Sequence, residues 1–212
     1  MDLSNTNQRA GGNPMRSYII SRRHEEFSWD KVPTLQVDNH QWLEPAPISV
    51  QAQICYDDSA LYVKMAAVEP NIRAEGKCET DFPHLDSCLE FFFCPIPGNK
   101  QYINVEFNPN GCMFFGLGFP GNAAIRMLPE RELLDIKTQR TDDGWFVTYQ
   151  IPYDLIRHIF PDFRAQSGMK IRANCYKCGF ETVQQHYITW NKVELPNPSF
   201  HCPDHFGEMI FE

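Results

Sequence analysis

The sequence predicts an all-β protein, an antiparallel sandwich or barrel with one short helix. Short apolar segments alternate with turns rich in Gly, Pro, Asn and Asp, and strands do not alternate with helices as they would around a parallel sheet. Aromatic residues make up 13% of the 212 residues, including 16 Phe and 8 Tyr, and large flat side chains favour the pleated surface of a sheet. A chain of this length can form one large β domain.

The predicted strands follow one another along the chain, most of them bounded by a turn signal such as Asp57-Asp58-Ser59 or Pro109-Asn110-Gly111. They are expected over 48–56, 61–68, 87–93, 102–108, 112–117, 145–151, 170–178, 186–190 and 208–211. The helix is expected over 153–160, because Pro161 cannot continue it. Residues 1–15 are mostly polar, which predicts a flexible tail before a single domain over 16–212.

The charge balance excludes some classes of partner. The net charge of −8 and the lack of a basic run argue against nucleic acid and anionic membrane surfaces, which need clustered Lys and Arg. No apolar stretch approaches the ~20 residues that span a bilayer. A neutral ligand remains compatible with this composition.

The eight cysteines and the polar N-terminus bear on the compartment. Several cysteines lie in apolar segments, where a free thiol behaves as a small hydrophobe. We therefore expect reduced cysteines and a cytoplasmic protein. The alternative is a secreted or periplasmic protein whose signal peptide has been removed, because the N-terminus as written has no apolar signal region.

The predicted strand over 102–108 carries a row of polar side chains on one face. Side chains alternate between the faces of a strand, so Ile103, Val105 and Phe107 belong to the core. The other face presents Tyr102, Asn104, Glu106 and Asn108. Amides and carboxylates can pair with sugar hydroxyls, which both donate and accept; the alternative is an ordinary solvated face.

Glu90 interrupts the apolar strand over 87–93, where a carboxylate is costly unless it is paired or faces a ligand. It either shares a ligand site with Glu106 or forms an ion pair with Arg126, Arg172 or Lys177. Paired carboxylates also raise the possibility of a glycan-active enzyme, although no further catalytic partner is evident nearby.

Three other features need an interpretation. Trp190 ends a strand beside a loop and could stack on a sugar ring, or belong to the core.

Cys175 and Cys178 form a CxxC pair without a regular second pair of metal ligands. A flat strand sends positions i and i+3 to opposite faces, which argues against a shared metal ion. The loop over 198–207 is expected to act as a structural plug, held by Phe200, Pro203 and Phe206.

These segments together resemble the carbohydrate-binding module family 9-like proteins of the DOMON-like β-sandwich superfamily. The resemblance extends from about residue 48 to the C-terminus. It rests on five motifs in the family's order, which lie over 86–93, 102–111, 172–179, 186–191 and 200–212.

The resemblance implies a jelly-roll sandwich in which two tryptophans hold a sugar. Trp190 matches one of them, whereas His84 stands where the other would be, with Phe82 nearby. Glu90 matches the carboxylate of the site, and Arg126 matches an arginine on the following hairpin. The family's sugar modules also carry a structural calcium ion, but no acidic loop in this sequence indicates one.

The leading hypothesis is non-catalytic binding of a mono- or oligosaccharide without a cofactor. The expected ligand-binding residues are Trp190, His84, Glu90, Asn104, Glu106, Asn108 and Arg126. The alternatives are a small enzyme that uses Glu90 and Glu106 as acid and base, and a scaffold or cofactor-binding sandwich, including one that holds haem through His or Met ligands. Neither the sugar nor the oligomeric state is determined by these patterns.

Overall fold

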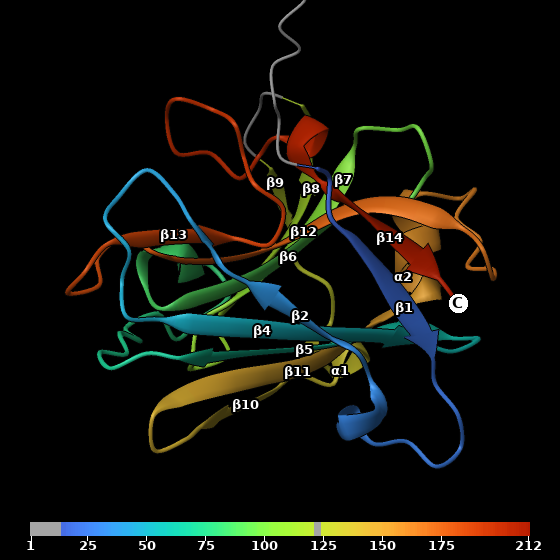
Figure 1. Cartoon of the computed structure of the whole chain (residues 1–212). Coiled ribbons are helices and arrows are strands. Elements are labelled where there is room, and N and C mark those ends of the chain that lie inside the picture. The colour runs from blue at the N-terminus through green and yellow to red at the C-terminus, as the bar shows by residue number, and fades with distance from the viewer. Residues whose placement is uncertain (1–13, 121–123) are drawn as a thin grey trace, which may run out of the picture.

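The computed structural model describes residues 14–120 and 124–212. They form two curved β-sheets that pack face to face (Figure 1). One sheet, called here the site sheet, contains β3 (Asn39–His40), β6 (Cys88–Cys94), β7 (Tyr102–Phe107), β8 (Met113–Gly118), β9 (Ile125–Met127), β12 (Lys170–Gly179), β13 (His186–Thr189) and β14 (Gly207–Phe211). The other, the back sheet, contains β2 (Thr34–Val37), β4 (Ser49–Tyr56), β5 (Ala60–Val68), β10 (Lys137–Arg140) and β11 (Gly144–Pro152).

The first strand, β1 (Ser17–Arg22), joins the two sheets. Its first part pairs with β14 and its end pairs with β4, in both cases in parallel. All the other pairings between strands of the described chain are antiparallel, so the predicted antiparallel sandwich is mostly right and β1 is the exception.

Every strand predicted from the sequence is present, with ends that coincide or differ by one residue. The predicted helix is α2 (Tyr153–Ile159). The prediction of one short helix is incomplete, because the structure also has α1 (Arg131–Leu134) and the 3-10 turns η1 (Trp29–Lys31), η2 (Pro83–Leu85) and η3 (Pro203–His205). Residues 1–13 of the predicted tail lie outside the described residues.

The main hydrophobic core lies between the sheets. Alternate residues of β7, including Val105 and Phe107, face it from the site sheet, and Val63 and Val147 face it from the back sheet. The alternation read from the sequence is therefore confirmed on this side of β7.

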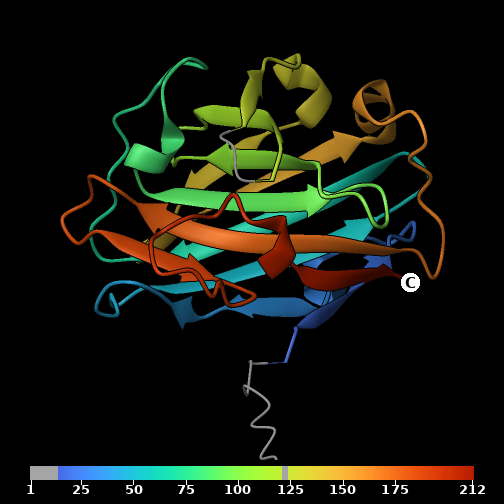
Figure 2. The ribbon, with the colours of Figure 1, turned by 90° about the horizontal axis from the view of Figure 1, so that it is seen from above.

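A second apolar cluster lies on the outer face of the site sheet. Phe92, Tyr102 and Tyr176 project outward there, and residues of the loop over 191–206 cover them. The Phe200 ring stacks on Tyr176 with 4.1 Å between ring centroids, and Figure 2 shows this loop running across the sheet. Its part from residue 198 onward is the structural plug predicted from the sequence, and the whole loop over 191–206 is called here the plug loop.

The eight cysteines are all free thiols. Cys175 packs in the main core and Cys178 in the outer cluster, so the two ends of the CxxC pair lie on opposite faces, as a flat strand predicts. Across residues 14–120 and 124–212, no helix has the length and apolar character needed to cross a membrane.

Candidate carbohydrate site

A pocket of about 190 Å³ opens beside the plug loop, on the outer face of the site sheet. Its floor is formed by strands β6 and β7, and its walls by the turn η2, the end of β12, strand β13 and the plug loop. The lining residues are His84, Glu90, Glu106, Phe180, Tyr187, Pro198, Ser199, Phe200 and His201.

Glu90 and Glu106 lie directly opposite each other on β6 and β7 and form the polar floor of the pocket. Both are buried. Glu90 Oε1 accepts a hydrogen bond from the Cys178 thiol at 2.9 Å, and Glu106 Oε1 accepts one from Asn104 Nδ2 at 2.8 Å. Glu106 Oε2 is buried and has no hydrogen-bond partner among the described residues.

The surroundings favour the protonated form of these two carboxyl groups. Burial raises the pKa of Glu90 well above its ordinary value, and the neighbouring Cys178 adds to the effect. Burial likewise raises the pKa of Glu106, and the charge of Glu90 raises it further. Two neighbouring buried carboxyl groups cannot both ionise cheaply, so the floor can both donate and accept hydrogen bonds.

His84 stands at the rim, close to the free oxygen of Glu106. Its Nδ1 lies 3.9 Å from Glu106 Oε2, too far for a hydrogen bond. Burial, with a contribution from the charge of Arg126, lowers the pKa of His84. The imidazole is therefore largely neutral near pH 7, and this contact is not an ion pair.

Aromatic rings surround His84. The ring of Phe82 is 5.5 Å and that of Phe180 is 5.3 Å from the imidazole, between centroids. Phe180 in turn contacts Tyr187 at 5.2 Å. Phe82 and Phe180 are 52% and 44% exposed, so flat apolar faces are available beside the polar floor, which is the combination that sugar rings require.

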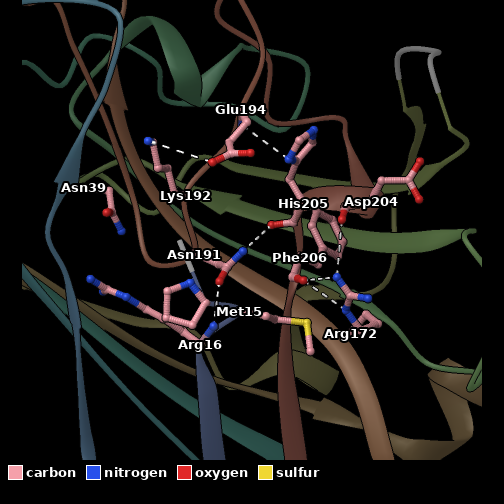
Figure 3. Close-up of a pocket in the computed structure, with 11 residues that line it drawn as sticks. Met15, Arg16, Asn39, Arg172, Asn191, Lys192, Glu194, Asp204, His205 and Phe206 are labelled. Atoms are coloured by element: carbon pink, nitrogen blue, oxygen red, sulfur yellow. Dashed lines mark hydrogen bonds and ion pairs between the residues drawn. The ribbon is translucent and has the colours of Figure 1, made fainter. Parts of the chain in front are cut away.

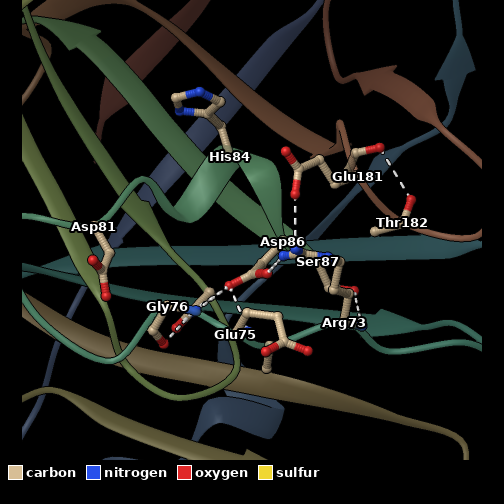
Figure 4. Close-up of polar contacts among 12 residues, drawn as sticks. Arg73, Glu75, Gly76, Asp81, His84, Asp86, Ser87, Glu181 and Thr182 are labelled. Carbon is tan, nitrogen blue, oxygen red and sulfur yellow. Dashed lines mark hydrogen bonds and ion pairs between the residues drawn. The ribbon is translucent and has the colours of Figure 1, made fainter.

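The turn that presents His84 is held by Asp86, the residue that follows it. Asp86 accepts hydrogen bonds from the Arg73 guanidinium, from the backbone N–H groups of Glu75 and Gly76, and from Asn108 Nδ2 (Figure 4). Burial alone would raise the pKa of Asp86, but these donors, Asn108 first, bring it below its ordinary value. The anionic Asp86 therefore ties the turn η2 to the segment over 73–76 and to Asn108 at the end of β7.

This network corrects the prediction for Asn108. Its amide donates to Asp86 and to the Gly76 carbonyl, and its Oδ1 accepts from the backbone of Asn110 and Cys112. The side chain is fully buried. Asn108 is thus a structural residue and has nothing left to offer a ligand.

Asn104 is also fully buried and lies beside Glu106 on the same face of β7, but it does not line the pocket. Its Nδ2 orients the Glu106 carboxyl group. Its Oδ1 lies where a Cβ on Gly116 would be, so the glycine provides the space that Asn104 occupies. We conclude that Asn104 positions Glu106 and does not itself contact a ligand.

The role expected for Trp190 is wrong. Trp190 is only 3% exposed and belongs to the main core. Its ring packs on Gly207, where an added Cβ would overlap it. A ring without an exposed face cannot stack on a sugar, so of the two interpretations left open by the sequence, the core one holds.

Arg126 lies outside the pocket wall. It donates to the carbonyl oxygens of Glu79 and Asp81, and its guanidinium stacks 5.0 Å above the Phe82 ring. Arg126 therefore holds the segment over 79–82 in place. Its charge also lowers the pKa of His84 and opposes the rise in the pKa of Glu106.

The alternative of an ion pair for Glu90 fails because each suggested cation has other partners. Arg126 binds carbonyl groups, and Arg172 binds the carbonyl of Phe206. Lys177 lies on the core side of β12, 3.0 Å from Glu69 Oε2.

Asp81 and Asp86, two acidic side chains near the pocket, are engaged in contacts other than the structural calcium ion that the resemblance implies. The oxygens of Asp86 are taken up by Arg73, Asn108 and backbone N–H groups, and Asp81 accepts from the N–H groups of Lys77 and Cys78. The group of three possible metal ligands found in the described chain includes two thiols, and calcium prefers oxygen ligands.

A larger groove of about 370 Å³ lies at the other side of the plug loop (Figure 3). Its central polar groups are already in use. Arg172 donates to the carbonyls of Phe206 and Gly207, and Asn191 bonds Arg16 N and the His205 carbonyl. Phe206 is buried, so the groove lacks an exposed aromatic face.

Six residues that line the pocket were not predicted from the sequence as site residues. They are Phe180, Tyr187, Pro198, Ser199, Phe200 and His201. Phe180 follows the last residue of β12 as an isolated aromatic at a strand end, which was an available signal. Tyr187 alternates outward on β13, whereas Phe200 comes to the pocket only because its loop folds back over the sheet.

The fold and the pocket define a β-sandwich with a pocket on the outer face of one sheet. The model of carbohydrate-binding family 9 matches residues 23–211, and the chain belongs to that family. No protein with a curated description matches the sequence.

Solved structures show the same fold. A protein from Bacteroides uniformis ATCC 8492, to which carbohydrate binding has been ascribed, is 21% identical with a TM-score of 0.82 over 94% of this chain and 100% of that chain. A family 9 module from Caldicellulosiruptor kristjanssonii in complex with glucose is 13% identical with a TM-score of 0.67, over 93% and 96% of the two chains. The complex of such a module with cellotriose gives 14% identity and a TM-score of 0.66, over 93% and 94%.

Proposed function

We propose that this protein binds a carbohydrate in the pocket between His84, Glu90, Glu106 and Phe180, without transforming it. The observation that carries the proposal is the free oxygen of Glu106 on the pocket floor. A buried carboxyl oxygen left without a partner costs about 1–3 kcal/mol, and a sugar hydroxyl can either donate to it or accept the proton that it carries. Family membership and the sugar complexes of similar folds support the same class of ligand.

The pocket offers the two kinds of contact that a sugar needs. The carboxyl groups of Glu90 and Glu106 and the neutral His84 can pair with hydroxyl groups that donate and accept. Phe180 and Phe82 offer exposed faces to the apolar side of a pyranose ring. Its volume of about 190 Å³ suits one sugar residue or the end of a short oligosaccharide.

The arrangement of the two carboxyl groups favours binding over hydrolysis. Glycoside hydrolysis needs two carboxyl groups that flank the scissile bond. Glu90 and Glu106 are direct cross-strand neighbours, and their side chains project from the same face of the sheet. Both carboxyl groups therefore lie on the same side of a bound ligand and do not flank one of its bonds.

The test is a glycan array followed by calorimetry on each hit, with wild type, Glu106→Gln and Phe180→Ala. We expect at least a tenfold loss of affinity in both variants, because each removes a direct contact. His205→Ala, in the larger groove, is the matched control and should bind like wild type. Unchanged affinity in the two pocket variants would place the ligand elsewhere, and release of a shortened product from a bound glycan would contradict the non-catalytic part.

A further inference from the structure

We propose that Cys88, Glu90 and Cys178 form a binding site for a zinc ion beneath the pocket. Cys88 on β6 lies directly opposite Cys178 on β12. Glu90 lies two residues further along β6, on the same face of the sheet. One ligand atom from each of the three side chains lies within 4.8 Å of the others.

The spacing suits a small ion. Zinc binds thiolate sulfur at about 2.3 Å and carboxylate oxygen at about 2.0–2.2 Å in a tetrahedron, which places neighbouring ligand atoms roughly 3–4 Å apart. Cys178 Sγ is already 2.9 Å from Glu90 Oε1. Small side-chain rotations therefore bring all three atoms onto one ion without a change of the strands.

The three ligands lack other strong partners. The Glu90 carboxyl group interacts with both thiols, with Cys178 at 2.9 Å and with Cys88. Outside this group, the Cys88 thiol has a contact of 4.0 Å with Leu89 O, and the Cys178 thiol one of 3.7 Å with the His84 carbonyl. Zinc would supply the positive charge that this buried group lacks, and the protons of the two thiols and of the Glu90 carboxyl group would be released to solvent.

The choice of metal follows from the ligands. Thiolates select zinc and other soft ions over calcium and magnesium. Glu90 also lines the pocket, so solvent can supply a fourth ligand, as in zinc sites with three protein ligands and one open position. The site does not require that the pocket bind sugar.

The site is tested with the full-length chain, freed of metal by a chelator and kept reduced by a phosphine. Cadmium serves as the spectroscopic probe, because its bond to thiolate gives an ultraviolet charge-transfer band, and zinc affinity is measured by competition with a chromogenic chelator. Wild type is expected to take up one equivalent of each metal. Absence of the cadmium band in wild type would overturn the proposal.

The variants identify the ligands. Cys178→Ser and Glu90→Gln are expected to weaken zinc binding by more than about 100-fold, since even outer-shell changes cost 10–100-fold. Cys175→Ser, on the other face of the same strand, and Cys94→Ser, further along β6, are matched controls that should bind zinc like wild type. Glu90→Gln keeps both thiols and the side-chain volume. It therefore tests whether Glu90 is a zinc ligand even if Cys178→Ser does not fold.

The competing role for the two thiols is a disulfide across β6 and β12. Formation of a Cys88–Cys178 disulfide in metal-free protein exposed to oxidised glutathione, together with no metal uptake by the reduced protein, would replace the zinc site by a redox pair. Zinc uptake that persists in Glu90→Gln and Cys178→Ser would place the ion elsewhere.

Discussion

At the scale of single residues, two acidic side chains define the site. Glu90 and Glu106 are held side by side on the pocket floor by strand pairing, and their neighbours are thiol, amide and imidazole groups instead of cations. The fold tolerates this cost because it keeps both groups largely protonated. Such sites of perturbed pKa often mark function.

The raised pKa of Glu106 predicts a pH dependence of stability. Below its ordinary pKa of 4.5, the carboxyl group is neutral in the folded and the unfolded chain, and no stability is lost. As the pH rises above 4.5, the unfolded chain releases its proton first, so stability falls until the pH passes the raised pKa of the folded state. Glu106→Gln cannot ionise and should exceed wild type at pH 8 by about 1.4 kcal/mol for each unit of upward shift.

Urea denaturation at pH 4 and pH 8 measures this effect. The gain from Glu106→Gln should be present at pH 8 and much reduced at pH 4. Glu25→Gln, at an exposed position, is the control and should show no gain at either pH. An equal effect of Glu106→Gln at both pH values would contradict an ionisable origin.

At the scale of elements, the plug loop is as important as the strands. Its side chains, chiefly Phe200 and Phe206, cover the outer face of the site sheet and turn a surface that would otherwise be solvated into a second core. The loop also supplies the outer wall of the pocket. Binding and stability are therefore coupled in this loop.

Phe200→Ala is expected to destabilise the protein by about 3–5 kcal/mol, because it leaves a cavity over Tyr176. It should also make the loop more sensitive to proteolysis. Val183→Ala is the control, since Val183 is 86% exposed and should change stability by less than about 0.5 kcal/mol. Thermal melts and limited proteolysis measure both effects, and a stable, resistant Phe200→Ala protein would mean that the loop is not a true plug.

At the scale of the whole molecule, β1 connects the two sheets by pairing with β14 and with β4. Disturbing its inward side should therefore weaken both sheets together. Ile20 is fully buried in the main core, whereas Ile19, the next residue, is 46% exposed. The two positions form a matched pair on one strand.

Ile20→Ala should cost about 2–5 kcal/mol, and Ile19→Ala less than about 0.5 kcal/mol. Guanidinium denaturation followed by fluorescence and by circular dichroism should give one shared transition for each variant, as expected if the two sheets unfold as a unit. Separate transitions of the two probes would show that β1 does not couple the sheets.

The sequence by itself determined the fold class, the family and most of the strands. Hydrophobic alternation and turn residues are local properties, so strands such as β5 and β7 could be read from them directly. The strands missed were β1, β2, β3, β9 and β10. Some of them are short, and others, such as β1, pair with strands that are distant in the sequence. Their own residues show only a weak alternation of apolar and polar side chains.

Only the tertiary structure decided which polar and aromatic residues form the site. Alternation placed Asn104, Glu106 and Asn108 on one face. A long-range network with Asp86 engages Asn108, and Asn104 is buried against Glu106 and does not line the pocket. Trp190 lies in the core and Phe180 stands at the rim instead. Periodicity reports the face of a strand on which a side chain lies, whereas burial and hydrogen bonding depend on what the rest of the chain places over that face.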